Sequence, residues 1–145
     1  MIRSLLSALV IAVLPSCSAG FRSQWQTAVA TARPASSIEG PWEGHWTSGF
    51  NGHTGKLSCV VGPEKADHTR EFFYHATWGK IFSGSFRATH EVSQSGGVTH
   101  FKAKHDIGKR GTFHAEGTIS GSEFKATYKA AGDHGTFVMK RPQGS

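Results

Sequence analysis

The chain has 145 residues, with 16 Lys and Arg against 10 Asp and Glu, which gives a formal net charge of +6. This length allows one domain with a substantial hydrophobic core. Eighteen glycines and ten phenylalanines, with leucine scarce after the first residues, indicate short strands and tight turns rather than a helical bundle.

The first residues have the composition of an export signal. A single Arg3 precedes an apolar run at 4–14, which is shorter than the roughly 20 residues that cross a bilayer. An exported protein is a poor candidate for nucleic-acid binding, so the basic charge points to solubility or to anionic envelope components.

The run ends in Leu14-Pro15-Ser16-Cys17, which resembles the bacterial lipobox despite the proline. The resemblance implies that residues 1–16 are a signal peptide and that Cys17 is lipidated. The protein would then be anchored to the cell envelope, at the outer membrane or on the periplasmic side. Ordinary cleavage and secretion without an anchor is the alternative. Either outcome leaves Cys59 without a disulfide partner, and its apolar neighbours favour a buried, inert thiol.

Residues 17–37 form a tether between this signal and the folded domain. Ser23 with Gln26 matches a capping box, and Trp25 begins one apolar helical face. We expect a short helix that ends before Pro34 and rests on the barrel mouth through Trp25, with a flexible linker as the alternative.

Eight segments with strand-like alternation fill residues 38–141, and residues 142–145 form a tail. Phe113, Ala115 and Ile119, for example, share one face, while His114 and Glu116 share the other. An apolar and a polar face on each strand is the half-buried antiparallel pattern. The expected strands are 40–47, 55–61, 69–78, 81–92 with a bulge at Gly84, 98–105, 112–119, 123–130 and 135–140.

An open sheet of this size exposes its edges, so closure is favoured. The sequence therefore predicts an all-β fold, an antiparallel meander barrel of about eight strands, with a two-sheet sandwich as the alternative. The first strand carries Trp42 and Trp46 four residues apart on one face, where their indoles plug the end of a barrel. The face of the 69–78 strand that turns inward stays open, because Phe72 and Phe73 are adjacent.

The Gly40-Pro41-Trp42 motif near the start of the domain resembles the Gly-x-Trp of lipocalins and of the related avidin group. That resemblance implies an eight-stranded meander barrel with a ligand site at its open end. The chain lacks the disulfide of many lipocalins, and avidin's ligand contacts do not map onto it. The pairing of Trp42-Glu43-Gly44-His45-Trp46 with Asp133-His134-Gly135-Thr136-Phe137 also looks similar to small exported bacterial proteins of unknown function.

The sequence contains no catalytic motif. It has nine histidines but no His-x-His, no zincin pair and no Cys/His finger, so we expect neither an enzyme nor a cofactor. His90 and His105 share the inward register of neighbouring strands, which leaves a metal or haem site as a weaker hypothesis.

We expect a monomeric binding protein for a small apolar or amphiphilic ligand. A filled barrel that acts as an envelope structural or inhibitor module is the alternative, because aromatic side chains of this kind also simply form a core. The candidate ligand-binding residues are Trp42, Trp46, Tyr74, Trp78, Phe86, His90, His105 and Tyr128.

Overall fold

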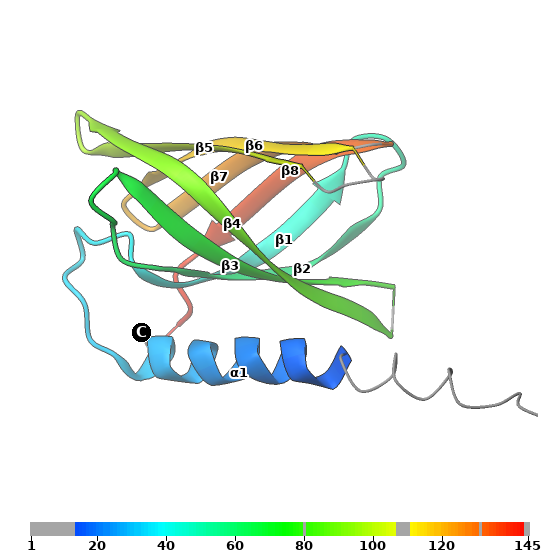
Figure 1. Ribbon diagram of the computed structural model, residues 1–145, viewed down its shortest axis with the longest axis horizontal. Coiled ribbons are helices and arrows are strands. Elements are labelled where there is room, and N and C mark those ends of the chain that lie inside the picture. The colour runs from blue at the N-terminus through cyan, green and yellow to red at the C-terminus, as the bar shows by residue number, and fades with distance from the viewer. Residues whose placement is uncertain (1–13, 80, 107–110, 131, 144–145) are drawn as a thin grey trace, which may run out of the picture.

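The protein is an eight-stranded antiparallel β-barrel with one helix packed against its outer wall (Figure 1). The computed structural model describes residues 14–79, 81–106, 111–130 and 132–143. Most of the expected signal peptide therefore lies outside the described residues. None of the described helices is long and apolar enough to cross a membrane.

Every strand pairs with its neighbours in the sequence, and β8 returns to pair with β1, which closes the barrel. The predicted all-β meander barrel is confirmed, and the sandwich alternative is wrong. The strands are β1 (Gly40–Ser48), β2 (Thr54–Val61), β3 (Thr69–Trp78), β4 (Phe82–Ser95), β5 (Val98–Asp106), β6 (Thr112–Ser120), β7 (Glu123–Ala130) and β8 (Asp133–Lys140).

Two details of β4 differ from the prediction. The strand continues to Ser95, because only Gly96 and Gly97 adopt the positive φ that the hairpin turn requires. The bulge expected at Gly84 is absent, since that residue pairs in regular register with Ala76 of β3. Strand β8 likewise begins two residues earlier than predicted, at Asp133.

Burial along the strands identifies the inner face. Trp42 is fully buried and Trp46 partly so, whereas Glu43 and His45 between them are exposed, as the alternation indicates. The ambiguity of β3 is resolved by packing. Phe72 and Tyr74 turn inward and are fully buried, and Phe73 points outward beneath the helix.

Helix α1 (Leu14–Ala30) includes Cys17 and begins nine residues before Ser23, so that serine does not cap it. The helix ends at Ala30, and the Arg33 guanidinium then donates to the Ala28 carbonyl oxygen at 2.8 Å. Pro34, further on, cannot continue a helix.

The helix lies along the side of the barrel rather than on its mouth, which corrects the expected position. Phe21 is its main contact, with its ring 5.1 Å from Phe73 and 5.0 Å from His75, measured between centroids. Trp25 stacks on Phe21 at 5.9 Å and so supports this contact. At Phe73 the outer face of β3 is therefore buried as well as its inner face.

One end of the barrel is sealed. Trp42 fills it, donating its indole N–H to the Ile38 carbonyl oxygen at 2.9 Å. The Arg141 guanidinium covers the ring at 4.1 Å and donates to the Pro41 and Ser37 carbonyl oxygens. We call this the closed end. Because Trp42 and Arg141 fill it, a ligand cannot enter the interior from this end.

Candidate functional site

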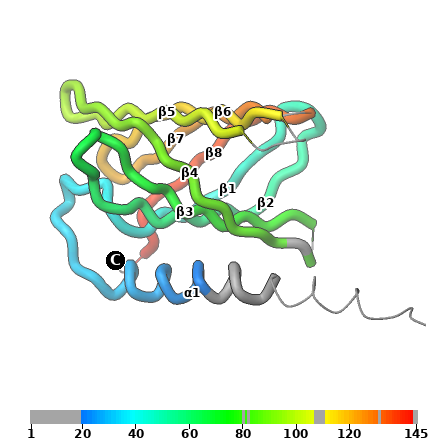
Figure 2. Tube along the Cα trace, in the orientation of Figure 1, coloured from blue at the N-terminus to red at the C-terminus, as the bar shows by residue number. Residues whose placement is uncertain are grey.

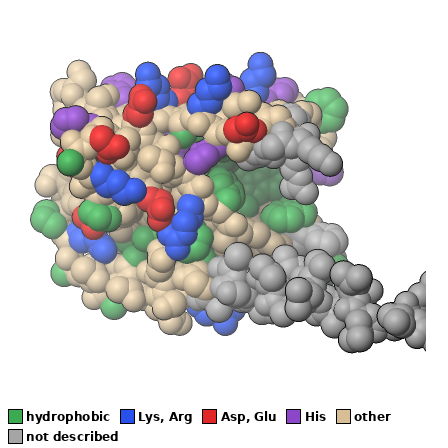
Figure 3. Space-filling model, viewed as in Figure 1, with side chains coloured by type: hydrophobic (Ala, Val, Ile, Leu, Met, Phe, Trp, Pro, Cys, Tyr) green, Lys and Arg blue, Asp and Glu red, His purple; other side chains and the backbone are tan. Residues whose placement is uncertain are grey.

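The opposite end of the barrel, which we call the mouth, is formed by the β1–β2, β3–β4 and β7–β8 turns and the strand ends beside them. Figure 3 shows the molecule hollowed on this side, with apolar side chains visible inside. An aromatic interior reached from solvent is the feature on this barrel that most resembles a small-molecule site.

The wall is split beside this hollow. The β4–β5 ladder runs only from Ser95↔Val98 to Glu91↔Lys102, so the earlier part of β4 diverges from β5 (Figure 2). The backbone N–H of Thr89 instead donates to Nε2 of His105 at 3.2 Å, across the divergence. This opening, which we call the β4–β5 split, exposes the interior from the side.

Five inward aromatic rings form a closed circuit within the mouth, and we call them the aromatic collar. Successive centroids lie 4.9, 5.8, 5.0, 6.5 and 5.9 Å apart. In that order the collar runs through Phe86, Tyr74, Phe137, Tyr128, Phe113 and back to Phe86.

Exposure across the collar is graded. Tyr74 is fully buried, whereas Phe86 is 39% exposed and Phe113 is partly buried. The two accessible rings belong to β4, which borders the split, and to β6, which pairs with β5 on the other side of it. An apolar molecule entering there meets ring faces and edges that water now contacts, so its burial is favourable.

Two glycines make room for the rings of the mouth. A Cβ on Gly135 would lie 2.8 Å from the Tyr128 ring, and one on Gly55 would lie 2.5 Å from the Trp46 indole nitrogen. Trp46 therefore lies over the β2 backbone, where its N–H donates to the Thr77 carbonyl oxygen at 2.8 Å. The absence of side chains at these two positions lets large rings fit a narrow barrel.

A polar cluster lies beside the collar. Asp133 accepts hydrogen bonds from Ser48 Oγ at 2.5 Å and from the Tyr128 hydroxyl at 2.9 Å. Burial alone would raise the pKa of this carboxyl, but the hydrogen bonds from Ser48, Tyr128 and the His134 backbone N–H, with the charge of His134, together hold the pKa below its usual value. Burial also raises the pKa of Tyr128, so its hydroxyl stays protonated and donates.

His90 is the most deeply buried polar side chain of the interior, with an exposure of 0%. Its Nε2 lies 3.0 Å from the Tyr74 hydroxyl, while no described residue offers a hydrogen bond to its Nδ1. Burial lowers the pKa of His90 to about 3, with a smaller contribution from His105, so the imidazole is neutral at pH 7.

The eight residues predicted to bind a ligand separate into three groups. Trp42 seals the closed end and cannot reach the mouth. Tyr74, Phe86 and Tyr128 belong to the collar, with His90 and His105 beside it at the split. Trp46 packs at the collar's edge, and Trp78, which is 45% exposed, lies on the rim.

Sequence reasoning did not select Phe113, Phe137, Ser48 or Asp133. The two phenylalanines could have been found, because they share the inward register of Ala115 and Met139 on their strands. The Ser48–Asp133 contact joins positions 85 residues apart and follows only from the β1–β8 pairing that closes the barrel.

The rim of the mouth carries exposed apolar side chains. Phe50 is 71% exposed, Trp78 45% and Ile81 85%, and they lie in or beside the β1–β2 and β3–β4 turns. Helix α1 begins toward this end and finishes near the closed end, where Arg33 lies against Gly40 (Figure 1). The start of the described chain therefore lies toward the mouth.

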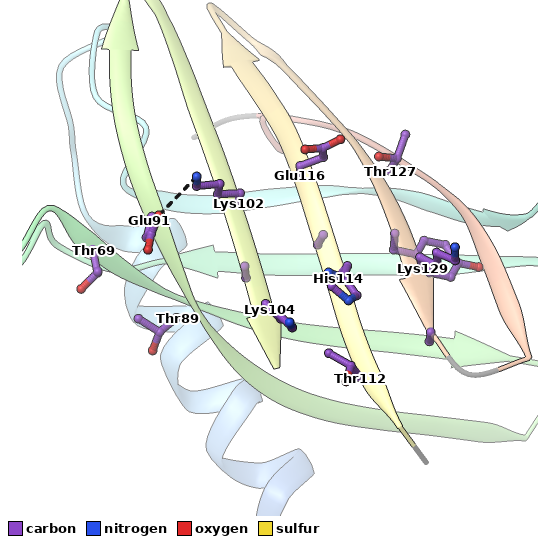
Figure 4. Close-up of a pocket in the computed structure, with 14 residues that line it drawn as sticks. Thr69, Thr89, Glu91, Lys102, Lys104, Thr112, His114, Glu116, Thr127 and Lys129 are labelled. Carbon is purple, nitrogen blue, oxygen red and sulfur yellow. Dashed lines mark ion pairs between the residues drawn. The ribbon is translucent and has the colours of Figure 1, made fainter. Parts of the chain in front are cut away.

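The outer face carries a row of basic and imidazole side chains. The cross-strand pairs Lys104↔His114, His114↔Lys129 and Lys129↔His134 place four of them in line across β5 to β8. Figure 4 shows the first three on successive strands, beside the ion pair of Lys102 with Glu91. No described carboxylate forms an ion pair with Lys104 or Lys129.

Neither a metal centre nor a reactive thiol emerges from the described residues. No group of three or more His, Cys, Asp or Glu side chains in that part of the chain is arranged to hold a metal ion. Cys59 is fully buried, and burial raises its pKa well above the usual value, which keeps the thiol protonated.

Compared with protein-family models, with curated proteins and with solved structures, the chain has no significant match in any of the three comparisons.

Proposed function

We propose that this protein is an exported, lipid-anchored carrier that binds a small apolar or amphiphilic molecule in the mouth of its barrel, without catalysing a reaction. The observation that carries the proposal is the aromatic collar, whose accessible rings, Phe86 and Phe113, flank the β4–β5 split. If the barrel served only to enclose a packed core, the wall beside Phe86 would be expected to be paired and the ring to be buried.

The mixed chemistry of the mouth favours an amphiphile. The collar supplies apolar contacts, and Asp133, Tyr128 and Ser48 form a satisfied polar cluster at the edge. A ligand with an apolar body and one polar group fits this arrangement, since polar groups in a ligand site fix orientation while apolar contacts supply affinity.

Fluorescence of the neutral probe N-phenyl-1-naphthylamine tests this function on the purified full chain. We expect a saturable rise in emission that dodecanoate reverses. Ala103→Phe places a ring on the inner face of β5 at the split and should weaken probe binding at least about tenfold. Ser93→Phe is the matched control, because the Ser93 side chain points outward on β4. Equal binding by wild type and Ala103→Phe, or no binding by either, would contradict the proposal.

The lipid anchor is part of the same proposal. It rests on the lipobox resemblance at Cys17, and the course of α1 toward the mouth would turn the apolar rim to the membrane. A carrier held in this way takes its ligand from the bilayer or delivers it there. Native mass spectrometry of the chain expressed with its own signal in a bacterial host should show a diacylglycerol-sized addition on Cys17. An unmodified chain would remove the anchor from the proposal.

Vesicle flotation tests the orientation separately from the anchor. We expect Phe50→Asp with Ile81→Asp to reduce flotation with phosphatidylglycerol vesicles, because both changes place charge on the apolar rim. Val138→Asp is the matched control, since Val138 is 54% exposed but lies on the outer face of β8. Equal losses in the two variants would mean that the rim has no special role.

A second candidate function is favoured by the basic row on the outer face. Lys104 on β5 and Lys129 on β7 lie to either side of His114, so this part of the outer face carries positive charge that attracts an acidic partner. In this alternative the protein is an envelope module that binds an acidic macromolecule. Retention on dextran sulfate should weaken in Lys104→Gln with Lys129→Gln, but not in Lys125→Gln, where Lys125 is paired with Glu123. Equal retention of the two variants would exclude this face as the binding site for an acidic macromolecule.

A further inference from the structure

We infer that the ligand carries an oxygen hydrogen-bond acceptor, and that Nδ1–H of His90 binds this oxygen at the base of the β4–β5 split. The inference rests on the proposed carrier function and narrows its ligand class. It is carried by an imidazole nitrogen that is completely buried and has no hydrogen-bond partner among the described residues.

Proton counting on the Tyr74–His90 pair identifies the free group as a donor. The neutral pair has two polar hydrogens, one phenolic and one on the imidazole, and the 3.0 Å contact between the hydroxyl and Nε2 uses one of them. If Nε2–H donated, both the buried phenol O–H and Nδ1 would lack partners. If the phenol donates, only Nδ1–H remains, and this tautomer has the smaller desolvation cost.

The position of His90 in the strand places it at the opening. Glu91↔Lys102 is the last pair of the β4–β5 ladder, so His90 is the first residue of β4 beyond it. His105 of β5 lies close enough to lower the pKa of His90 and itself binds Thr89 across the split. A group that enters between the two strands therefore approaches His90 beneath the collar ring of Phe86.

The surroundings of His90 favour an acceptor over a donor. Arg70 is its cross-strand partner on β3, and the Nε of Arg70 is also buried without a partner among the described residues. The guanidinium donates through Nη1 to the Gly62 carbonyl oxygen at 2.9 Å. Two adjacent strand positions thus present unused N–H groups, and a carbonyl or carboxylate oxygen is the complement of such donors.

The test compares two probes of nearly the same shape, 2-isopropenylnaphthalene and 2-acetylnaphthalene, in which a methylene group of the first is replaced by the carbonyl oxygen of the second. Calorimetric titration of the wild-type full chain should give tighter binding of 2-acetylnaphthalene by about 3- to 10-fold, the effect of one buried hydrogen bond. His90→Phe keeps an aromatic ring among Phe72 and Phe101 but removes the N–H, so the two probes should bind it equally. His75→Phe makes the same replacement on the outer face of β3, where His75 stacks on Phe21, and as the matched control it should retain a preference for the carbonyl.

Histidine-selective nitrogen NMR of the wild type keeps the test independent of whether His90→Phe folds. The free protein should show the Nδ1–H tautomer, and 2-acetylnaphthalene should shift the Nδ1 resonance while 2-isopropenylnaphthalene does not. An Nε2–H tautomer, or an equal carbonyl preference in wild type and His90→Phe, would overturn the inference while the carrier function stands. Failure of both probes to bind the wild type would instead count against the carrier function.

Discussion

The two ends of the barrel differ in how they surround two tryptophans of the same strand. Trp42 and Trp46 lie four residues apart on the inner face of β1, and each donates its indole N–H to a backbone carbonyl oxygen, at 2.9 and 2.8 Å. Trp42 is fully buried under Ile38 and Arg141, whereas Trp46 stays partly exposed beside the collar. Tryptophans with the same position in the strand pattern therefore close the barrel at one end and line its opening at the other.

The difference comes from the segments outside the barrel strands. At the closed end, the residues before β1 and after β8 converge, so that Arg141 reaches the Ser37 carbonyl oxygen at 2.7 Å across 104 positions in sequence. At the mouth no such pair of segments crosses the opening in the described part of the chain. The segments before β1 and after β8 thus seal one end of the barrel, and the proposed ligand site lies at the end that they leave uncovered.

Truncation of the two tryptophans should separate the ends most strongly. Trp42→Ala removes a fully buried indole and should lower the free energy of unfolding by about 3–5 kcal/mol. Trp46→Ala should cost about 1–2 kcal/mol, because part of that ring already contacts water. Urea unfolding measures both, with Trp42→Phe as the milder control. Equal losses at the two positions would contradict the division into a sealed and an open end.

The seal itself should depend on the shape of Arg141 as well as its charge. Arg141→Ala removes three hydrogen bonds to backbone carbonyl oxygens and the contact with the Trp42 ring, for an expected loss of about 3 kcal/mol. Arg141→Lys should recover less than half of this, since an ammonium group cannot span the three acceptors. Full recovery by lysine in the same urea assay would show that charge alone maintains the seal.

The barrel was predictable because alternation is a local signal. Each strand except β3 shows its inner face in its own sequence, and the strands expected at 112–119 and 123–130 pair as a hairpin. The helix was less predictable. Ser23 has the sequence of a cap, but Phe21, two residues earlier, packs on Phe73 and His75 and thus stabilises a helix that begins before it.

The candidate site was only partly predictable, because it depends on long-range pairing. Inward aromatics such as Phe86 could be selected from periodicity alone. The sequence contains no sign that the part of β4 before Glu91 is separated from β5, since His90 continues the same alternation. Nor does it indicate that Asp133 reaches Ser48. These contacts arise when the barrel closes, so local pattern carries no information about them.

His90 should make stability depend on pH in a way that the closed end does not. Its pKa is about 3 in the folded state against about 6.5 when exposed, so the unfolded state binds the extra proton between these values. Stability attributable to this residue is therefore complete above pH 6.5 and falls as the pH is lowered toward 3. Tyr74, Arg70 and His105 are the polar or charged groups that face it.

Urea unfolding of wild type and His90→Phe from pH 7 to pH 5 isolates this contribution. The wild type should lose about 2 kcal/mol more than the variant across that interval, because one pKa unit corresponds to about 1.4 kcal/mol. Contributions that the two proteins share cancel in the difference. Parallel pH profiles would show that His90 is solvated in the folded state, and would weaken its assignment to the base of the split.

The smallest expected effect concerns the polar edge of the mouth. Tyr128→Phe removes the hydrogen bond to Asp133 but keeps the collar ring, and Asp133 still accepts from Ser48 and from the His134 backbone N–H. The expected loss in the free energy of unfolding is therefore about 1 kcal/mol at pH 7. The loss should shrink as the pH falls below about 4, because the hydroxyl helps to hold the Asp133 pKa below its usual value and protonation removes that advantage.

Ser48→Ala is the matched variant at the same carboxylate. Its loss should exceed that of Tyr128→Phe, because Ser48 Oγ also accepts from the Phe50 backbone N–H, which would lose its partner. If Tyr128→Phe were the costlier change, the collar would depend on its hydroxyl for the position of the ring. Polar contacts would then fix the side chains of the mouth, as those of Arg141 do at the closed end. The two ends would differ only in whether chain segments cover them.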